Sequence, residues 1–320
     1  MRQEILRLED VTYKKEDVII FRNMMLNIMD GEVMGLCPLN TYGLDELLEV
    51  IISNPPLYYG YVYYQERCVN SWKETGHGRN RICIIGSETS LVNGLSVVTN
   101  IFTLRAGFGK ELVNEHILAR QLMPFLEEMG ISLDPFILVD HLTSYERVLV
   151  ELLRAIVAGY RLIIFREIGT VISEEELKRL HQIMHYYTGK KFSFLYISFH
   201  FEEIQQICSR AALMSEGNID LIFEDEQVQK GVSNALYLDY YNHVSNRVHH
   251  HIRTLGEEVL LVRDMSGRYL DHFRFRVYKG ECLVIQSLDT QLYKEILEIL
   301  KQEDGRRHAD MVIRGKRVKG

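Results

Sequence analysis

The chain has 320 residues, of which 47% are hydrophobic and 25% are charged, and its formal net charge is −7. This composition is typical of a folded protein with about two domains and a sizeable core, which excludes a largely disordered chain. The acidic balance argues against a protein whose main role is nucleic-acid binding. One basic stretch near the C-terminal end is interpreted as a solvated strand and turn (Arg314, Lys316, Arg317 and Lys319).

The cysteines are widely spaced and have neither C-x-x-C nor zinc-ligand spacing (Cys37, Cys68, Cys83, Cys208 and Cys282). Most stand in apolar runs, which predicts buried thiols in a reducing cytoplasm. The N-terminal stretch MRQEILRLED has no apolar signal core, and charged residues interrupt the longest apolar region, Val148–Phe165. We therefore predict a cytoplasmic chain without a membrane-spanning segment.

The segment Gly31–Ile51, GEVMGLCPLNTYGLDELLEVI, carries the first recognisable pattern. Its apolar run Val33–Cys37 is typical of a strand buried in a parallel sheet, and apolar residues recur at helical spacing after Gly43. We predict a strand, a tight loop and a helix over residues 44–52. Phosphate-binding proteins carry the motif G-x-x-x-x-G-K-[ST] in such a loop, where backbone N–H groups, Lys and a hydroxyl hold phosphate and Mg²⁺.

In this chain the motif frame reads Pro38-x-x-x-x-Gly43-Leu44-Asp45, so that only the second Gly is kept. Leu44 has no charge, and Asp45 and Glu46 put two carboxylates where a polyphosphate would arrive. Taken alone, the segment indicates an ordinary strand, loop and helix. We expect Asp45 or Glu46 to accept backbone N–H bonds in the first helical turn, because a carboxylate stabilises the positive end of a helix.

Two later segments predict secondary structure. A group of tyrosines alternates partly before a turn, which favours an antiparallel strand with one aromatic face over a platform for ligand stacking (Tyr58, Tyr59, Tyr61, Tyr63 and Tyr64). Residues 142–157 are predicted to form a helix whose apolar face packs inward (Val148, Leu152, Ala155 and Ile156).

A polar, Asn-rich stretch further along contains a group of histidines (His243, His249, His250 and His251). Neither a carboxylate nor a thiol stands at metal-ligand spacing from them. We therefore interpret the stretch as a linker, with a metal site as the alternative.

The chain contains an internal repeat. Gly31–Val69 aligns without gaps with Gly280–Val318, and both begin with Gly-Glu; the helical segment ELLEVI recurs as EILEIL. Upstream, Ile5–Thr12 (ILRLEDVT) pairs with Val259–Ser266 (VLLVRDMS), with one short insertion or deletion between the two matches. We predict two copies of one domain, the second of them cut short.

Several segments in the right order resemble the tandem ATP-binding-cassette proteins that energise sugar import. The resemblance covers nearly the whole chain. Besides the Gly-Glu turn and the loop frame, it rests on segments similar to the glutamine loop, the signature motif, the Walker B strand and the switch-histidine strand (ICIIGSETSLVNGLSVVTNIF, Ile82–Phe102; LTSYERVLVELLRAI, Leu142–Ile156; RLIIFREIGTVIS, Arg161–Ser173; FLYISFHFEEIQQICSRAALMSEGNI, Phe194–Ile219).

The resemblance implies an α/β, P-loop-NTPase-like cassette with a mainly parallel core sheet, an antiparallel β subdomain near the N-terminus and a helical subdomain around residues 96–155. It implies a degenerate cassette at 1–222, a linker at 223–257 and a truncated β lobe of a second cassette at 258–320. Two explanations of the short second copy stay open. Either the native chain is longer, or the lobe docks on the first cassette and covers its sheet edges.

Most positions that this family uses for ATP carry other residues here. Gly43 is kept, but Leu44 stands at the position of the phosphate-binding Lys and Asp45, followed by Glu46, at that of the Mg²⁺-binding Ser. Ser87 stands at the glutamine-loop position, and its hydroxyl is too short to reach metal and water. These positions predict weak or absent nucleotide binding.

The signature and Walker B positions also differ. Thr143 keeps a hydroxyl, whereas Tyr145 replaces a signature glycine, and its ring is expected to fill the approach to a γ-phosphate. The Walker B strand ends in Arg166-Glu167 instead of Asp-Glu. Glu167 matches the catalytic position, but without a metal or a positioned phosphate we expect it to be inactive and to serve as a surface or N-cap carboxylate.

Phe199 occupies the switch-histidine position, and His200 follows it. We expect this one-residue step along a strand to point His200 to the opposite face, so that it is a poor substitute. In the second copy, Leu292 replaces the counterpart of Gly43, and Lys294 falls at the Mg²⁺-ligand position.

These losses favour a pseudo-ATPase without a nucleotide cofactor. It would keep the fold and act as a structural or regulatory partner in sugar import or sensing, bound to a membrane permease, a sensor protein or a second cassette, and not to nucleic acid. The alternative is a working ATP-binding and ATP-hydrolysing subunit of a sugar importer that uses ATP and Mg²⁺, which the retained Gly43 and Glu167 support. A nucleic-acid or metabolite binder that reuses the fold is a third possibility, and the acidic balance disfavours the nucleic-acid case.

The resemblance also predicts one contact. In active relatives the positions of Asp45 and Arg166 converge on one Mg²⁺, so we expect these residues to be neighbours in space. Because both substitutions invert the local charge, we predict that Arg166 pairs with Asp45 or Glu46 where the metal stood. If the pair is fully buried, removal of Arg166 should cost about 3–5 kcal/mol of stability.

Overall fold

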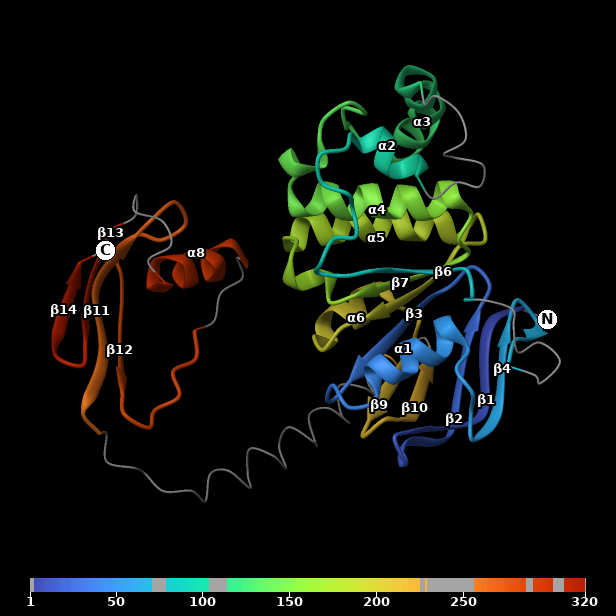
Figure 1. Ribbon diagram of the computed structural model, residues 1–320, viewed down its shortest axis with the longest axis horizontal. Coiled ribbons are helices and arrows are strands. Elements are labelled where there is room, and N and C mark those ends of the chain that lie inside the picture. Colours follow the sequence, from blue (N-terminus) through green and yellow to red (C-terminus); the bar gives the residue numbers. More distant parts are fainter. Residues whose placement is uncertain are drawn as a thin grey trace. The chain divides into compact units, whose positions relative to one another are not determined.

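The protein is described by a computed structural model that covers residues 3–70, 79–103, 114–224, 228, 256–285, 290–301 and 308–319. The chain divides into two compact units, Met1–Leu238 and Asp239–Gly320, which are described separately (Figure 1). The histidines of the expected linker and most of that linker lie outside the described residues.

Two sheets form the framework of the first unit. An antiparallel sheet has the order β2-β1-β4-β5 (β1, Glu4–Lys15; β2, Val18–Met29; β4, Tyr59–Tyr64; β5, Arg67–Cys68). A six-stranded sheet has the order β10-β9-β3-β8-β7-β6, and all its neighbours are parallel except β9 and β10 (β3, Val33–Pro38; β6, Ile82–Ile85; β7, Leu162–Arg166; β8, Ser193–Ile197; β9, Arg210–Ser215; β10, Asn218–Glu224).

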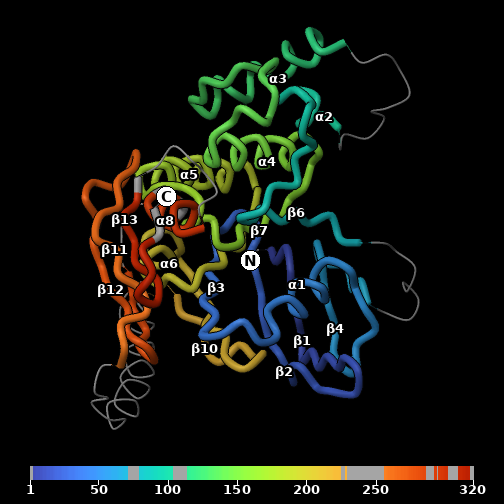
Figure 2. Tube along the Cα trace, turned by 60° about the vertical axis from the view of Figure 1, so that its left-hand side comes forward, coloured from blue at the N-terminus to red at the C-terminus, as the bar shows by residue number. Residues whose placement is uncertain are grey.

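Helices cover this framework (α1, Leu44–Ser53; α2, Val97–Phe102; α3, Glu115–Met129; α4, Ser144–Ala158; α5, Glu174–Thr188; α6, Phe201–Ile207), with short 3₁₀ turns η1 (Val139–His141) and η2 (Ile168–Thr170). Helices α2 and α3 lie at one end of the unit and the antiparallel sheet at the other, as Figures 1 and 2 both show. Helices α2 and α3 form a separate apolar cluster with part of α4. The expected parallel sheet, antiparallel subdomain and helical subdomain are thus confirmed.

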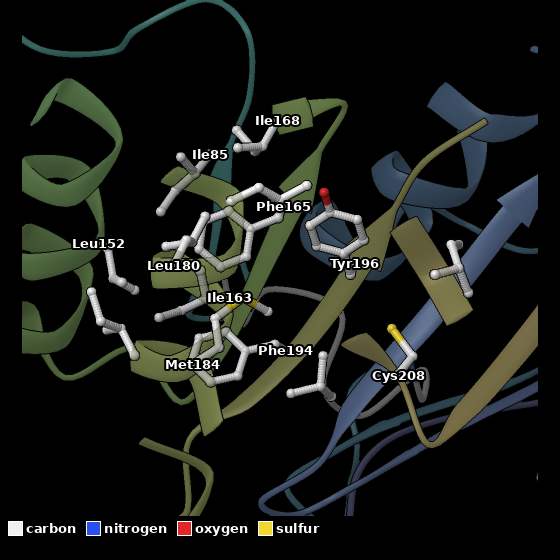
Figure 3. Packing of buried hydrophobic residues seen from close by; sticks show 14 of the residues in the cluster. Ile85, Leu152, Ile163, Phe165, Ile168, Leu180, Met184, Phe194, Tyr196 and Cys208 are labelled. Atoms are coloured by element: carbon white, nitrogen blue, oxygen red, sulfur yellow. The ribbon is translucent and has the colours of Figure 1, made fainter. Parts of the chain in front are cut away.

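The side chains of the parallel sheet alternate between two cores. On β7, Ile163 and Phe165 pack with α4 and α5, whereas Leu162 and Ile164 pack on the side of α1 and the antiparallel sheet. Figure 3 shows Phe165 beside Phe194 and Tyr196 in the first of these cores. Because successive side chains of a strand point to opposite faces, a strand buried on both faces must be apolar throughout, as the sequence pattern indicated.

Helix α4 confirms the helix expected over residues 142–157. Thr143 and Glu146 form a capping box, in which the Thr143 hydroxyl accepts from the backbone of Glu146 and the Glu146 carboxylate accepts from the backbone of Thr143. The helix ends at Gly159 in the left-handed conformation. All residues of the expected inward face are buried (Val148, Leu152, Ala155 and Ile156).

The second unit repeats the N-terminal sheet of the first. Its order is β12-β11-β13-β14, and helix α8 packs on it (β11, Glu258–Ser266; β12, Phe273–Tyr278; α8, Thr290–Lys301; β13, His308–Ile313; β14, Lys316–Lys319). The register agrees over the first pairs of the central strand: Leu6 pairs with Tyr64, and their counterparts Leu260 and Ile313 pair in the same way. The internal repeat is therefore confirmed, because the second unit repeats the strand order of the N-terminal sheet and carries a matching helix.

One hydrogen bond of the Gly-Glu turn recurs in both units. The Glu32 carboxylate accepts from the backbone N–H of Met29 at 2.6 Å, and the Glu281 carboxylate accepts from that of Tyr278 at 2.7 Å. The same dipeptide thus closes the same turn twice. The basic stretch near the C-terminal end forms the turn after β13 and strand β14, as expected.

The structure confirms the strand expected for the tyrosine segment but not the burial expected for every cysteine. The tyrosine segment forms β4, in which Val62 and Tyr64 are buried and Tyr59 and Tyr61 are exposed, as a strand with one aromatic face requires. Cys37 and Cys208 are buried, but Cys282 is exposed, in contrast to the expected buried thiol. None of the helices in the described part of the chain is long and apolar enough to cross a membrane.

A buried ion pair joins the Gly-Glu turn to β9. The Arg210 guanidinium lies 2.8 Å from the Glu32 carboxylate and donates to the Asn27 side chain at 2.9 Å, and both charged side chains are almost fully buried. The variant Arg210→Ala should lose about 3–5 kcal/mol of unfolding free energy, because Glu32 is left as an unpaired buried charge. Urea unfolding followed by circular dichroism measures this loss.

The matched control is Arg179→Ala, which removes an exposed pair with Glu175 on α5. Its expected cost is about 0.5 kcal/mol or less, because solvent screens exposed pairs. Equal losses in the two variants would contradict the assignment of Arg210 as a structural ion-pair partner.

Candidate functional site

Most of the candidate residues follow neighbouring strands of the parallel sheet at the edge where those strands end. The loop 39–43 follows β3, Ser87 follows β6, Glu167 follows β7, and Phe199 follows β8. The carboxyl ends of parallel strands form the usual ligand-binding edge of such a sheet. The topology therefore brings these segments, distant in sequence, to one edge.

The loop after β3 uses several of its own N–H groups. The N–H of Leu39 donates to the Met214 carbonyl at 2.8 Å, and the N–H of Tyr42 donates to the Asn40 side chain at 3.1 Å. The N–H of Leu44 donates to the Thr41 carbonyl at 3.3 Å. A phosphate cradle needs free, converging N–H groups, and these three already have acceptors within the protein.

Gly43 has a backbone reason for its identity. Its φ is +78°, in the left-handed region, and an added Cβ would lie 2.7 Å from the Cα of Gly217 in the β9–β10 turn. Any other residue would be strained and would collide with this turn. The glycine that survives from the phosphate motif is thus explained by packing alone.

Leu44 is the first residue of α1, and its side chain points into the core. It is 1% exposed and packs in the cluster that contains Leu47 and Leu48. The residue at the position of the phosphate-binding Lys therefore contributes to burial, which an apolar side chain stabilises.

The expected carboxylate cap of α1 is wrong. No side chain forms a cap hydrogen bond at the start of this helix. Asp45 instead lies 2.7 Å from the guanidinium of Arg166, and Glu46 lies 3.3 Å from the ammonium of Lys15. Both carboxylates still stand at the positive end of the helix, but a charge-assisted bond to a cation is stronger than a bond to a neutral N–H.

The ion pair of Asp45 and Arg166 confirms the expected contact. Its environment differs from the fully buried case, because the Asp45 side chain is 71% exposed and the Arg166 side chain 37%. Water screens such a pair, so its contribution to stability is about 0–1 kcal/mol. The pair still changes the charge at this edge of the sheet, because the Arg166 guanidinium lies where a metal-binding carboxylate is expected.

Glu167 is half-buried and strained, with a φ of +54°. It stands at the N-cap position of η2 but forms no cap hydrogen bond, so that the N-cap role expected for it is wrong. Its carboxylate accepts from the backbone N–H of Phe199 at 3.0 Å. Burial raises the pKa of Glu167, and the hydrogen bond from Phe199 partly offsets the rise. This residue fastens the segment after β8 to the end of β7.

The strand-face argument for His200 is wrong, because β8 ends at Ile197 and both Phe199 and His200 lie beyond it. His200 is the N-cap residue of α6, and both side chains are exposed. Ser87 is exposed as well and lines a pocket of about 210 Å³ next to the start of α4.

The signature positions serve helix α4. Thr143 is the N-cap residue described above, and Tyr145 is half-buried against the α4–α5 core. Burial raises the pKa of Tyr145. Tyr145 also lines a groove of about 770 Å³ with Glu176 and Arg179 of α5. Tyr145 thus packs between these helices, and that its ring fills the approach to a phosphate stays a prediction.

Sequence analysis missed a buried polar group on α4. Glu151 accepts from the backbone N–H of Ser90 at 2.5 Å and from its hydroxyl at 2.8 Å, and Arg154 pairs with Glu151 at 3.6 Å. This network ties the segment after β6 to α4. Its signal was the pair of charges inside the long apolar run, since buried charges require partners.

The counterpart of the site in the second unit lies on α8. Leu292 packs against the core of that unit, and Lys294 follows on the same helix. Within the ranges that the structure covers, no three His, Cys, Asp or Glu residues are grouped to hold a metal ion. The residues at the edge of the first sheet do not fit Mg²⁺ and a polyphosphate, because Arg166 is a cation and Leu44 is buried.

The stability contribution of the Asp45–Arg166 pair can be measured by a double-mutant cycle with Asp45→Asn and Arg166→Ala. The expected coupling free energy is about 0.2–1 kcal/mol, and it should fall in high salt because the pair is exposed. Urea unfolding at low and high salt checks this. The exposed Glu175–Arg179 pair on α5 is the control, and a coupling of about 3 kcal/mol would contradict the exposed geometry.

The packing of Gly43 is tested by Gly43→Ala with Gly94→Ala as the matched control. Both positions have positive φ, +78° and +75°, but no atom lies within 4 Å of a Cβ added at Gly94. Each variant should lose about 1–2 kcal/mol from backbone strain, and Gly43→Ala should lose clearly more because of Gly217. Thermal and urea unfolding compare the two, and equal losses would refute the close contact.

Comparisons with known proteins agree with this fold. No protein-family model matches the chain. The chain is 25% identical over 321 residues to the ribose import ATP-binding protein RbsA of Caldanaerobacter subterraneus subsp. tengcongensis, a match that covers 95% of this chain and 62% of the relative. It is 23% identical to the xylose import ATP-binding protein XylG of Histophilus somni, over 89% of this chain and 58% of the relative. The chain thus spans about three fifths of these relatives.

Solved structures share the fold at low sequence identity. The structure of cbiO1 from Clostridium perfringens, part of an ABC transporter complex, matches with a TM-score of 0.62 and 16% identity, over 76% of this chain and 99% of the other. An ATP-binding cassette of an ABC transporter in its ADP conformation matches with a TM-score of 0.63 and 18% identity, over 75% and 98%. The chain therefore has the fold of an ATP-binding cassette and is related in sequence to ATP-binding proteins of ribose and xylose import.

Proposed function

We propose that this chain is a cassette of the sugar-import type that has lost ATP hydrolysis and acts as a structural or regulatory partner of a membrane permease or a sensor protein. In this proposal it works in the cytoplasm, at the inner face of the membrane, alone or paired with another cassette. The observation that carries the proposal is the ion pair between Asp45 in the first turn of α1 and Arg166 at the end of β7.

The charges of this pair oppose binding of Mg²⁺ with ATP. Two unit charges about 4 Å apart interact by about 4 kcal/mol at an effective dielectric constant near 20. Asp45 would repel phosphate oxygens, and Arg166 would repel the metal that a carboxylate at its position would attract. Leu44 removes the positive charge that would attract phosphate, Asp45 adds a repulsion, and Arg166 replaces an attraction for the metal by a repulsion. The pair of Asp45 and Arg166 also satisfies both side chains without a ligand.

The geometry of the loop supports the same proposal. Three of its N–H groups have acceptors within the protein, and Leu44 offers no charge because its side chain is in the core. Glu167 holds the backbone of Phe199. A general base needs a positioned nucleophile to act on, and this hydrogen bond gives Glu167 a structural use that needs none.

The second candidate function is a working ATP-binding subunit of a sugar importer that uses ATP and Mg²⁺. It is favoured by the relatives, which are described as ribose and xylose import ATP-binding proteins. The half-buried Glu167, with its raised pKa, stands at the matching catalytic position. The two candidates differ in one measurable property, the affinity for Mg²⁺ with ATP.

A titration with a fluorescent ATP analogue and Mg²⁺ tests the proposal. We expect no saturable binding up to about 1 mM nucleotide, because the repulsion at Asp45 and Arg166 exceeds what binding tolerates. The ribose import ATP-binding protein RbsA of Clostridium perfringens, a relative with 26% identity, serves as the positive control. A micromolar dissociation constant for this chain would refute the loss of nucleotide binding and support the importer subunit.

The double variant Asp45→Ser, Arg166→Asp separates the two obstacles. If charge inversion is the main obstacle, this variant should bind the analogue more tightly than the unaltered chain. If it binds no better, the closed loop and the buried Leu44 are the main obstacle. Purification from native membranes with the candidate permease tests the partner role independently.

A further inference from the structure

The outer face of the antiparallel sheet in the first unit carries a row of tyrosines. The inner face of this sheet packs on α1 and the parallel sheet (Figure 1). On β4, alternate side chains point away from that core: Tyr59 is 61% exposed, Tyr61 is 51% exposed, and the half-buried Tyr63 follows in the same row. Exposed aromatic surface that is gathered on one face marks an interaction site in many proteins.

One ring of the row already holds an arginine of the same chain. Arg7 of β1 lies directly across from Tyr63, and its guanidinium carbon is 4.2 Å from the centre of the Tyr63 ring. The carboxylates of Glu4 and Glu9 lie 3.5 Å and 3.4 Å from the same guanidinium. Cation–π attraction and charge attraction act together in this arrangement. The face therefore contains its own example of how it binds arginine.

The next two rings of the row also stand beside carboxylates. Tyr61 lies directly across from Glu9, and its ring centre is 6.3 Å from that of Tyr63. Asp10 is the next residue of β1, in a bulge that faces the residue between Tyr59 and Tyr61. Asp10 is exposed, and in the part of this unit that the structure describes it pairs with no Lys or Arg. The exposed rings thus have a carboxylate nearby that is available to a partner.

The backbone fixes the place of Asp10. Its φ is +51°, in the left-handed region, which an Asp side chain tolerates better than most others. Gly60 faces this bulge from β4, and a Cβ added there would collide with the Asp10 carbonyl. The bulge therefore fits against a glycine and cannot shift along the strand. Asp10 is held at a constant position beside the two exposed rings.

The charge of this face selects the class of partner. Its carboxylates, Glu4, Glu9 and Asp10, outnumber the cation Arg7, so that the face attracts a basic side chain. A second copy of the chain is a poor occupant, because a net charge of −7 opposes self-association. Of the two basic side chains, arginine suits the rings better than lysine. Its planar guanidinium stacks on an aromatic face and is more weakly hydrated than an ammonium group.

From these observations we infer that the outer face of the antiparallel sheet binds an arginine-bearing segment of a partner protein. A guanidinium of the partner stacks on Tyr59 or Tyr61 and pairs with Asp10, in the way that Arg7 stacks on Tyr63 and pairs with Glu9. The inference goes beyond the proposed function and does not depend on it. None of these residues belongs to the edge of the parallel sheet that the nucleotide argument concerns.

A fluorescently labelled peptide that alternates Arg and Gly is the probe, and the full chain is the target. Fluorescence anisotropy measures binding, and mass spectrometry measures nitration of individual tyrosines by tetranitromethane. In the free chain Tyr59 and Tyr61 should react about as fast as Tyr42, which is 47% exposed at another place. Saturating peptide should slow both by about threefold or more and leave Tyr42 unchanged, because a stacked guanidinium covers the ring. A peptide with Lys in place of Arg should bind about fivefold more weakly.

Matched variants make the test specific. Tyr61→Leu should weaken binding of the Arg peptide by about two- to fivefold, whereas Tyr61→Phe should keep it, because the contact needs the ring. Asp10→Asn should weaken binding by a similar factor, and Asn is compatible with the positive φ at this position. The controls Tyr42→Leu and Asp17→Asn remove an exposed ring and an exposed carboxylate elsewhere, the second also at positive φ. Neither should change binding by more than about twofold.

Other results would overturn the inference. Equal binding of the Arg and Lys peptides, unaffected by Tyr61→Leu, would mean that only general charge attraction acts. An Arg peptide that does not bind would mean that the face does not accept arginine. Slow nitration of Tyr59 and Tyr61 in the free chain at every concentration would mean that the chain itself covers the face. Nitration that slows as the chain concentration rises would mean that a second copy covers it. Nucleotide binding by the first unit bears on none of these results.

Discussion

The central strand β3 is the element on which the rest of the first unit depends. It pairs in parallel with β8 on one side and β9 on the other, and it leads directly into the loop and helix α1. Its residues are buried on both faces, so that any displacement would open two cores at once. At its beginning, the buried Glu32–Arg210 pair attaches the Gly-Glu turn to β9. The loop therefore starts from a rigid position.

The loop after β3 is held closed by contacts within the protein. A phosphate-binding loop holds its N–H groups open for a ligand, whereas this loop is closed by its own hydrogen bonds and by the contact of Gly43 with the β9–β10 turn. The Leu44 side chain packs in the core, whereas a lysine at this position would contact a bound phosphate. Asp45, after the loop that follows β3, forms an ion pair with Arg166 at the end of β7, far away in sequence. The two charged side chains at this edge of the sheet thus pair with each other without a ligand.

The two units show that one local sequence pattern forms the same local structure twice. Strand order, the register of the first pairs and even the hydrogen bond of the Gly-Glu turn agree between them. Local strand pairing thus depends on nearby residues, because the hydrophobic pattern and the turns set the register of a strand.

The sequence by itself determined the elements whose signals are local. Sequence patterns predicted the apolar strand β3, the helices α1 and α4, and the repeat. This was possible because periodicity and turn chemistry act over a few residues. The pairing of Asp45 with Arg166 was also predicted, although only through a resemblance that placed both positions at one metal. The sequence did not predict that the pair is exposed to solvent.

Only the tertiary structure decided how individual side chains are used. It directed Leu44 into the core, turned Glu167 to the backbone of Phe199, left α1 without a carboxylate cap and paired Glu151 with Ser90. Each of these choices depends on a partner many residues away in the chain. A polar side chain takes the strongest partner within reach, and which partners are within reach is set by the packing of sheets and helices, not by neighbouring residues in the sequence.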